Sequence, residues 1–522
     1  MKHVLKHISD NRYKYLILAG IVAIMLMNMI RVLHSNAGTR FVVYAGGYDL
    51  SILKYVTVLL FMLLIVGFVF LFVKAYKWRA EQVFLVLGIL FGIIYSFLLP
   101  PFTAPDEAVH IDTIYYYASQ ILGQDAVDEN GTVLYRSDDA MYEHHGQHVP
   151  TIQSYGAVLY NFFKLDHSQG TTTFGRGPQN VSVIAYIPQT IGVTLARLFH
   201  LGNIQMLFWG RWFALVFFLV CVYWGIKLAP IGKEVIMIAA LLPITLQMAV
   251  SMSYDSTVLA LCFLYTGYLL YLTFEVPRIT WKHVAILAGL FVWMSPGKLV
   301  YLCLALTLLI IPAEKFANKR FKYISVVIVI ACGAAIILMT RYNTVVAIGS
   351  SEGGMLTEQT TYSVGYLIHN PKRLVEVIFG TIITQGTFYL ENMLSQYFGW
   401  LEITVPGYIV YGFVVLLVIA AIKKADEKYV LLPGQRLWVF IVIAGIASLA
   451  CLALLFDWTP IESNYVYGVQ GRYFLPMLPL LMMLCKNKQI EMKASMAKYI
   501  YAGLYVLQFL TIYHIYTVII GR

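Results

Sequence analysis

The sequence predicts an all-α polytopic membrane protein with about 13 transmembrane helices. The chain has 522 residues, of which 60% are hydrophobic and only 12% are charged, too few charges for the surface of a soluble protein of this length. Apolar runs of roughly 18 or more residues recur along the chain, and this is the length that a helix needs to cross a bilayer. Because backbone polar groups must be satisfied internally in lipid, these runs are expected to be helices.

The apolar runs predict 13 spans, within a range of 12 to 14. They cover residues 13–33, 51–73, 81–99, 205–228, 233–250, 256–274, 283–295, 298–312, 321–341, 404–423, 436–456, 471–485 and 498–520. The first run is too long for a cleavable signal peptide and has no small-residue cleavage site, so it is expected to stay as a span. Residues 1–80 are therefore interpreted as an amino-terminal transmembrane hairpin, and residues 81–522 as the main transmembrane domain.

Basic residues are sorted along the chain by side of the membrane. Of the 37 Lys and Arg, 23 lie in segments that share one side if the amino terminus is cytoplasmic. Residues 101–180, in contrast, hold ten Asp or Glu and three Lys or Arg, so this segment is placed outside. The net charge of +10 follows from this sorting and does not indicate a nucleic-acid partner.

Three large outer loops are expected, at residues 100–204, 342–403 and 457–470. Two apolar stretches inside the first and second loops, Val181 to Leu201 and Pro371 to Tyr389, would invert every later loop if they crossed the membrane. They are interpreted as juxtamembrane helices that lie on the outer face.

An acidic motif directly follows the third span. Asp106 is expected to begin an amphipathic helix that runs along the interface to about Leu122. Asp106 or Glu107 is interpreted as a general base or as a metal ligand at the membrane surface, and His110 shares a helix face with Glu107. The alternative is structural: Asp106 would form a capping box with Thr103, and His110 would satisfy Glu107.

Four more charged residues lie near the outer ends of predicted spans, where charge is costly. Lys298 and Arg472 each stand beside a Gly and near a Pro, which lets the backbone bend around an anion, and they are interpreted as cations that hold a lipid phosphate. Arg211 and Asp255 complete the set. These charges could also pair with one another, and for Arg211 snorkelling to the head groups is favoured.

A second candidate metal site lies in the first outer loop. His144 and His148 would share a face if their segment is helical, and imidazole suits zinc. No third ligand is evident from the spacing, so a solvated loop is the main alternative.

The motifs together resemble a known family. They are Pro105-Asp106-Glu107-x-x-His110, Phe398-Gly399-Trp400-Leu401-Glu402 and Gln470-Gly471-Arg472-Tyr473-Phe474-Leu475-Pro476. In this order they resemble the bacterial domain-of-unknown-function family 2142, which is similar in layout to the GT-C superfamily of membrane glycosyltransferases. The resemblance covers roughly residues 80–490, and it departs from the family at Ala108, where the family often has Pro.

This resemblance implies an inverting glycosyltransferase at the outer face of the plasma membrane. The donor would be a polyprenyl-phosphate sugar, and the acceptor a cell-surface glycan or a lipid-linked oligosaccharide. Asp106 and Glu107 would supply the base or bind a divalent cation such as Mg or Mn. The expected substrate-binding residues are His110, Lys298, Arg472, Gln470, Tyr473, Asp255 and Arg211.

Two other functions remain as alternatives: a flippase or transporter of a lipid-linked sugar, and a glycan polymerase or ligase. A transporter is expected to have midplane ionisable residues and broken helices in paired halves. The charges gather at outer ends and no internal repeat is visible, which favours the transferase.

Overall fold

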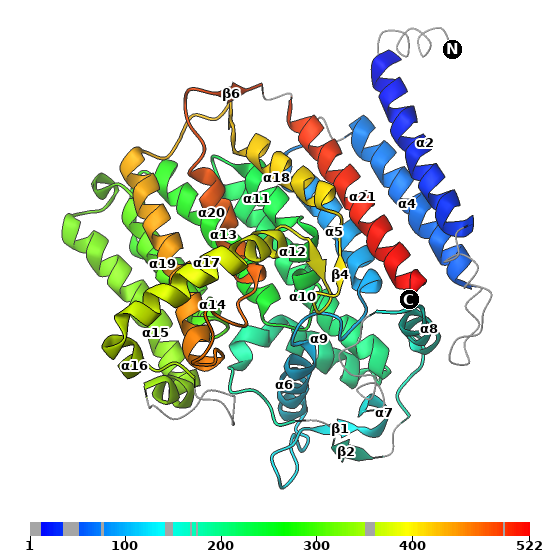
Figure 1. Ribbon diagram of the computed structural model, residues 1–522, viewed down its shortest axis with the longest axis horizontal. Coiled ribbons are helices and arrows are strands. Elements are labelled where there is room, and N and C mark those ends of the chain that lie inside the picture. Colours follow the sequence, from blue (N-terminus) through cyan, green and yellow to red (C-terminus); the bar gives the residue numbers. More distant parts are fainter. Residues whose placement is uncertain are drawn as a thin grey trace.

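The computed structural model describes residues 12–34, 52–74, 78–140, 150–167, 170–173, 176–349, 361–493 and 496–522, and it is mostly helical (Figure 1). Eight helices in this part of the chain are long and apolar enough to cross a membrane. They are α2 (Arg12–His34), α4 (Ile52–Lys74), α5 (Ala80–Leu98), α10 (Asn203–Leu228), α13 (Asp255–Phe274), α15 (Lys319–Gly349), α19 (Pro433–Asp457) and α21 (Ala497–Gly521). The prediction of an all-α polytopic membrane protein is confirmed.

The other five predicted spans are short or broken helices. They correspond to the pair α11 (Lys233–Ala240) and α12 (Pro243–Ala249), to α14 (Trp281–Met294), η5 (Leu299–Ile310) and α18 (Gly407–Ala421), and to the pair η7 (Gly471–Met477) and α20 (Leu478–Met483). Pro243 begins α12 and Pro476 lies inside η7. Because proline lacks an amide proton, each pair is interrupted at or near its proline.

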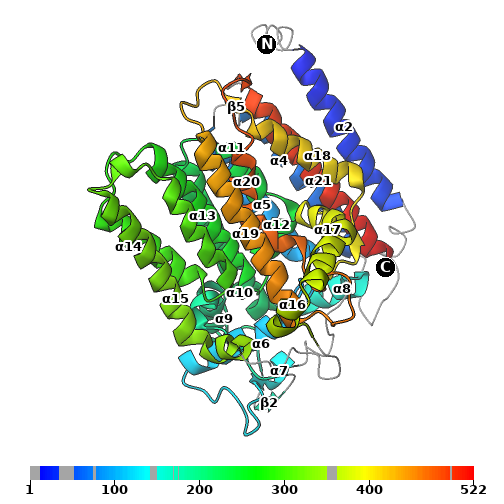
Figure 2. The same ribbon diagram turned by 60° about the vertical axis from the view of Figure 1, so that its left-hand side comes forward.

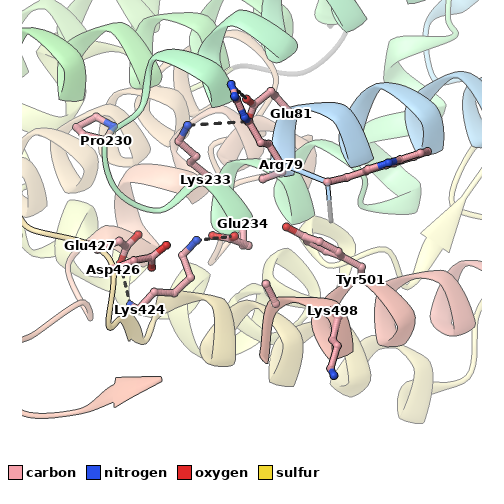
Figure 3. A pocket seen from close by; sticks show the side chains of 13 residues that line it. Arg79, Glu81, Pro230, Lys233, Glu234, Lys424, Asp426, Glu427, Lys498 and Tyr501 are labelled. Carbon is pink, nitrogen blue, oxygen red and sulfur yellow. Dashed lines mark hydrogen bonds and ion pairs between the residues drawn. The ribbon is translucent and has the colours of Figure 1, made fainter. Parts of the chain in front are cut away.

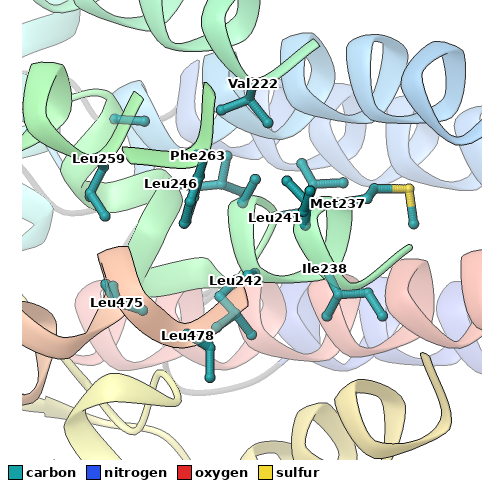
Figure 4. Close-up of a cluster of buried hydrophobic side chains, with 14 of the residues drawn as sticks. Val222, Met237, Ile238, Leu241, Leu242, Leu246, Leu259, Phe263, Leu475 and Leu478 are labelled. Carbon is teal, nitrogen blue, oxygen red and sulfur yellow. The ribbon is translucent and has the colours of Figure 1, made fainter. Parts of the chain in front are cut away.

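The α11–α12 pair lies at the centre of the protein, where every residue from Val235 to Met252 is buried. Figure 4 shows its apolar side chains among those of α10, α13, η7 and α20. Polar side chains satisfy the backbone at the break: Gln508 of α21 donates to the Leu241 carbonyl, and Thr245 Oγ1 donates to the Ala239 carbonyl at 2.7 Å. The break is therefore a fixed part of the core.

Connections that carry the basic segments meet at one end of the bundle. Strand β5 (Lys423–Lys424) pairs in parallel with β6 (Glu491–Met492), and the Gly232 amide donates to Glu427 at 2.7 Å. Near η6 (Ala313–Lys315), the Ile279 amide donates to the Lys315 carbonyl at 2.8 Å. Helix α5 starts at this end and leads to Asp106 at the opposite end.

The predicted first outer loop forms a small unit around α6 (Glu107–Ile121). Its other elements are β1 (Leu134–Arg136), α7 (Ser137–Ala140), α8 (Ile152–Asn161), β2 (Thr171–Thr173), η4 (Val183–Tyr186) and α9 (Ile187–Leu198), and β1 pairs antiparallel with β2. The helix predicted from Asp106 is confirmed, but its apolar side is turned to protein. The Tyr115 and Tyr135 rings lie 4.2 Å apart, and the Arg197 guanidinium lies 4.0 Å from the Tyr115 ring.

The predicted second outer loop contains α16 (Val364–His369), α17 (Pro371–Met393), β3 (Tyr397–Phe398) and β4 (Ile403–Thr404). Helix α17 is not among the candidate spans and runs obliquely to α19 in Figure 1. Arg373 of α17 donates to the carbonyls of Glu462 and Ser463, each at 3.1 Å, and so joins this loop to the third one. Figure 2 shows α16 and α17 near the end of the bundle that also holds α6 and α8.

Candidate functional site

A tight loop after α5 presents Asp106. Both Phe102 (φ 71°) and Asp106 (φ 62°) adopt left-handed backbone conformations, which are uncommon outside glycine and persist only where the surroundings impose them. Two groups impose them here: the Trp400 indole donates to the Ala104 carbonyl at 3.0 Å, and the Glu107 carboxylate accepts from the Ala104 amide at 3.3 Å. The β3–β4 turn therefore holds the loop that carries Asp106.

The predicted capping box of Asp106 and Thr103 is wrong. Asp106 is the N-cap residue of α6 but makes no side-chain capping bond, and the Thr103 hydroxyl donates to the Pro100 carbonyl at 2.7 Å. The Asp106 carboxylate is left to face outward, and half of its side chain is exposed.

Glu107 forms a fully buried ion pair with Arg211. Glu107 Oε1 lies 3.5 Å from Arg211 Nε and accepts from the Met252 amide at 2.9 Å. The Arg211 guanidinium donates to carbonyls of Leu99 at 2.8 Å, Ser96 at 3.0 Å and Val250. Snorkelling of Arg211 is therefore the wrong interpretation, because both side chains are completely buried. The pair joins α6 to α10 and has no opening to substrate.

Asp106 instead pairs with Arg472 at the start of η7. Asp106 Oδ2 lies 2.8 Å from Arg472 Nη2, and the Arg472 side chain is only 5% exposed. Gly471 allows this approach, because a Cβ atom there would lie 2.2 Å from the Tyr389 carbonyl oxygen in α17. The Arg472 amide donates to Asn392 Oδ1 at 3.2 Å, which fixes the start of η7 against the end of α17.

A second carboxylate extends this pair into a chain of alternating charges. Asp255 Oδ2 lies 3.9 Å from Arg472 Nε, and Asp255 Oδ1 lies 2.8 Å from Lys298 Nζ. The Lys298 ammonium lies 4.0 Å from the centre of the Tyr473 ring, within cation–π distance. The four side chains Asp106, Arg472, Asp255 and Lys298 are called the charge chain below. They come from four different elements, and their formal charges sum to zero.

His110 lies beside the charge chain in an aromatic environment. Its Nδ1 lies 2.7 Å from the Tyr186 hydroxyl, and its ring packs edge-on to Tyr254 at 4.8 Å. The Tyr186 hydroxyl donates to Gln179 at 3.1 Å, so its oxygen accepts from Nδ1–H and leaves Nε2 unprotonated. Burial lowers the pKa of His110 to about 4, with opposing contributions from Asp255 and Asp106, so the imidazole is neutral at pH 7.

Two buried atoms of the Gln-Gly-Arg motif are left without hydrogen bonds among the described residues. They are Gln470 Oε1 and Arg472 Nε. Buried polar atoms usually find partners, so these two atoms mark a place where the site holds unused hydrogen-bonding capacity. Of the predicted substrate-binding residues, the structure thus brings together His110, Lys298, Arg472, Tyr473 and Asp255 and separates Arg211 from them.

The metal candidates are not brought together. Within the described ranges there is no group of three or more His, Cys, Asp or Glu side chains that could hold a metal ion. The carboxylates of Asp106 and Glu107 pair with different arginines. His144 and His148 lie outside the described residues.

Comparisons with known proteins identify one family. A family model described as "Predicted membrane protein (DUF2142)" matches residues 89–481. The match includes the whole charge chain and leaves α2 and α4 outside. No curated protein and no solved structure matches the chain.

Proposed function

The chain belongs to the DUF2142 family of predicted membrane proteins, and we propose that it is a membrane glycosyltransferase that uses a polyprenyl-phosphate sugar as donor. The observation that carries this proposal is the Asp106–Arg472 pair, in which a half-exposed carboxylate lies 2.8 Å from a buried guanidinium. A transferase of this kind needs a base for the acceptor and a cation for the phosphate. The pair supplies both within one contact.

The topology proposed for this function has 13 crossings in a GT-C-like layout. The five short or broken elements would complete the eight long spans. The amino terminus would be cytoplasmic and the charge chain would lie at the outer face of the plasma membrane. Support comes from the basic connections at one end of the bundle and from the acidic first loop at the other.

In the proposed reaction, Asp106 takes the proton of an acceptor hydroxyl. The acceptor oxygen attacks the anomeric carbon, the bond between that carbon and the phosphate oxygen breaks, and polyprenyl phosphate leaves. The displacement inverts the configuration at the anomeric carbon. The acceptor would be a cell-surface glycan or a lipid-linked oligosaccharide.

Charge would move through the site together with the proton. When Asp106 is protonated it no longer neutralises Arg472, and the charge chain then carries a net charge of +1. At the same step the leaving phosphate gains negative charge, which Arg472 and Lys298 would stabilise. Arg472 Nε makes no hydrogen bond among the described residues and lies 3.9 Å from Asp255 Oδ2, so turning it toward a phosphate oxygen would break no hydrogen bond.

Neighbouring groups would position the two substrates. Neutral His110 offers an unprotonated Nε2 to a hydroxyl group, and Gln470 Oε1 offers a second acceptor. A divalent cation, Mg²⁺ or Mn²⁺, would bind at Asp106 if the reaction uses one, and chelation with EDTA tests that part of the proposal.

The test is turnover of a polyprenyl-phosphate sugar by purified protein in nanodiscs, with an extract of cell-surface glycan as acceptor. Release of polyprenyl phosphate is measured for the wild type and for Asp106→Asn. The matched control is Asp125→Asn, an exposed carboxylate beyond the far end of α6. We expect release by the wild type and by the control, and a loss of about 100-fold or more in Asp106→Asn.

A flippase for a lipid-linked sugar is the second candidate, because the pairs α11–α12 and η7–α20 are broken helices of the kind found in transporters. The hydrogen bonds of Gln508 and Thr245 at the α11–α12 break argue against it, since they hold the break in place. A flippase would release no polyprenyl phosphate and would move the sugar lipid equally well with Asp106→Asn. A polymerase or ligase would release polyprenyl phosphate only with a preassembled glycan as donor.

A further inference from the structure

A charged cavity lies at the end of the protein opposite Asp106. It has a volume of about 340 Å³ and opens between the starts of α5, α11 and α21 and the segment that follows α18 (Figure 3). This is the end at which the basic connections meet. The cavity shares no residue with the charge chain and has no part in the transfer proposed above.

Short ion pairs between side chains line one half of this cavity. Lys424 Nζ lies 2.8 Å from Glu234 Oε1. Behind it, Lys486 Nζ lies 2.6 Å from Glu427 Oε2, and Glu427 also accepts from the backbone amides of Gly232 and Lys424. These groups neutralise one another and form one wall of the cavity.

The other half contains three charged groups that lie close together without hydrogen bonds between them. Arg79 Nη1 lies 3.9 Å from Glu81 Oε1, and Lys233 Nζ lies 3.9 Å from Glu81 Oε2. Glu81 is 2% exposed, and its Oε2 accepts no hydrogen bond from any described residue. A buried carboxylate oxygen that lines a cavity and lacks a donor among the described residues leaves a place for a donor group on a ligand. We call Arg79, Glu81 and Lys233 the loose triad.

The charges of the loose triad define the ligand. Two cations and one carboxylate give a net charge of +1, which suits a singly charged phosphate ester. The ligand must also donate a hydrogen bond to Glu81 Oε2, and a hydroxyl group does so without adding charge. We propose that this cavity binds a phosphate ester that carries hydroxyl groups, such as the head group of a glycerol phospholipid.

The test compares ligands that differ in one feature each. Native mass spectrometry of the purified protein in detergent would measure binding of short-chain phosphatidylglycerol, phosphatidylmethanol and phosphatidylcholine, and of glycerophosphoglycerol, which is phosphatidylglycerol without its acyl chains. Phosphatidylmethanol keeps the anionic phosphodiester but has no hydroxyl, and phosphatidylcholine is zwitterionic. We expect phosphatidylglycerol to bind about tenfold more tightly than either lipid. If glycerophosphoglycerol binds as tightly, the ligand is a soluble ester, and if it binds more weakly, the ligand is a lipid.

Variants locate the binding within the cavity. Lys233→Gln should weaken phosphatidylglycerol binding about tenfold, and Glu81→Met, which removes the acceptor, should abolish the preference over phosphatidylmethanol. Lys498→Gln is the matched control, because Lys498 lines the same cavity but points away from the other labelled side chains in Figure 3. Equal binding of phosphatidylglycerol and phosphatidylmethanol by the wild type would overturn the proposal, and this comparison needs no variant to fold. Equal weakening by Lys233→Gln and Lys498→Gln would also overturn it.

Discussion

Glu107→Gln tests how the two adjacent carboxylates divide their roles. The structure buries Glu107 against Arg211 and leaves Asp106 half exposed beside Arg472. We expect Glu107→Gln to act on stability and Asp106→Asn to act on turnover. The two substitutions are chemically matched, and they change neighbouring residues.

The size of the stability effect follows from the contacts of Glu107. Its two carboxylate oxygens face Arg211 and the backbone amides of Ala104 and Met252. A glutamine removes the charge, leaves the buried guanidinium without a counter-ion, and turns an amide donor toward one of the backbone donors. Breaking a buried pair in this way costs about 3–5 kcal/mol. The Asp106 pair, whose carboxylate is half exposed and whose arginine keeps Asp255 as a second counter-ion, contributes less, on the order of 1 kcal/mol.

Unfolding by a denaturant in mild detergent, followed by tryptophan fluorescence, would measure both variants. A double-mutant cycle with Arg211→Met completes the experiment. We expect the double variant to be more stable than the sum of the two single changes predicts, by at least about 1 kcal/mol, because the second substitution removes the uncompensated charge.

One result would refute this reasoning. If Glu107→Gln unfolds at the wild-type denaturant concentration and has lost turnover, Glu107 is the base and its burial against Arg211 is not a structural role. Wild-type turnover by Asp106→Asn would show that Asp106 is not the base.

Three further predictions concern single sites. Trp400→Phe removes the indole donor that holds the loop before α6, so turnover should fall about tenfold while the fluorescence unfolding midpoint changes little. Gly471→Ala should abolish turnover and reduce the yield of folded protein, because a methyl group there would overlap the backbone of α17. The control is Gly289→Ala, where an added Cβ atom would have no other atom within 4 Å, and it should be neutral in both assays. Burial raises the pKa of Asp112 to about 6 and lowers that of His110 to about 4, so their effects on the pH dependence of stability oppose one another. Folded His110 binds fewer protons than unfolded His110 between about pH 4 and 6.5, so in Asp112→Asn, where only His110 acts, the free energy of unfolding should rise with pH in this range. Folded Asp112 binds more protons than unfolded Asp112 between about pH 4 and 6, so in His110→Gln, where only Asp112 acts, the free energy of unfolding should fall as the pH rises through this range.

Much of the fold could be predicted because lipid imposes simple rules on sequence. Long apolar runs mark α2, α4 and α21 directly, and the charge bias separates the basic connections from the acidic loop. The broken elements could not be assigned so easily. The run 233–250 has the composition of one span, but Pro243 divides it, and one of the two groups that satisfy the break, the Gln508 amide, lies far along the chain.

The candidate site was predictable where it depends on local motifs and unpredictable where it depends on pairing. Asp106, Arg472 and Lys298 stand out as charges at the ends of apolar runs. That Arg472 would meet Asp106, and Arg211 would meet Glu107, depends on how distant helices pack, and the spacing of these residues contains no signal for it. Trp400 is similar: its position in the sequence gives no sign that its indole bonds to the backbone of the Asp106 loop.

The fixed break between α11 and α12 has a consequence for the biogenesis of this protein. The Leu241 carbonyl receives its donor from Gln508, in the last helix of the chain, and Gln508 is itself held by the Tyr95 hydroxyl at 3.0 Å. While the chain is being synthesised, α11 and α12 leave the ribosome long before α21 exists. The centre of the bundle therefore stays incomplete until the ribosome has finished, and a chain that stops before α21 should be recognised and degraded by membrane quality control.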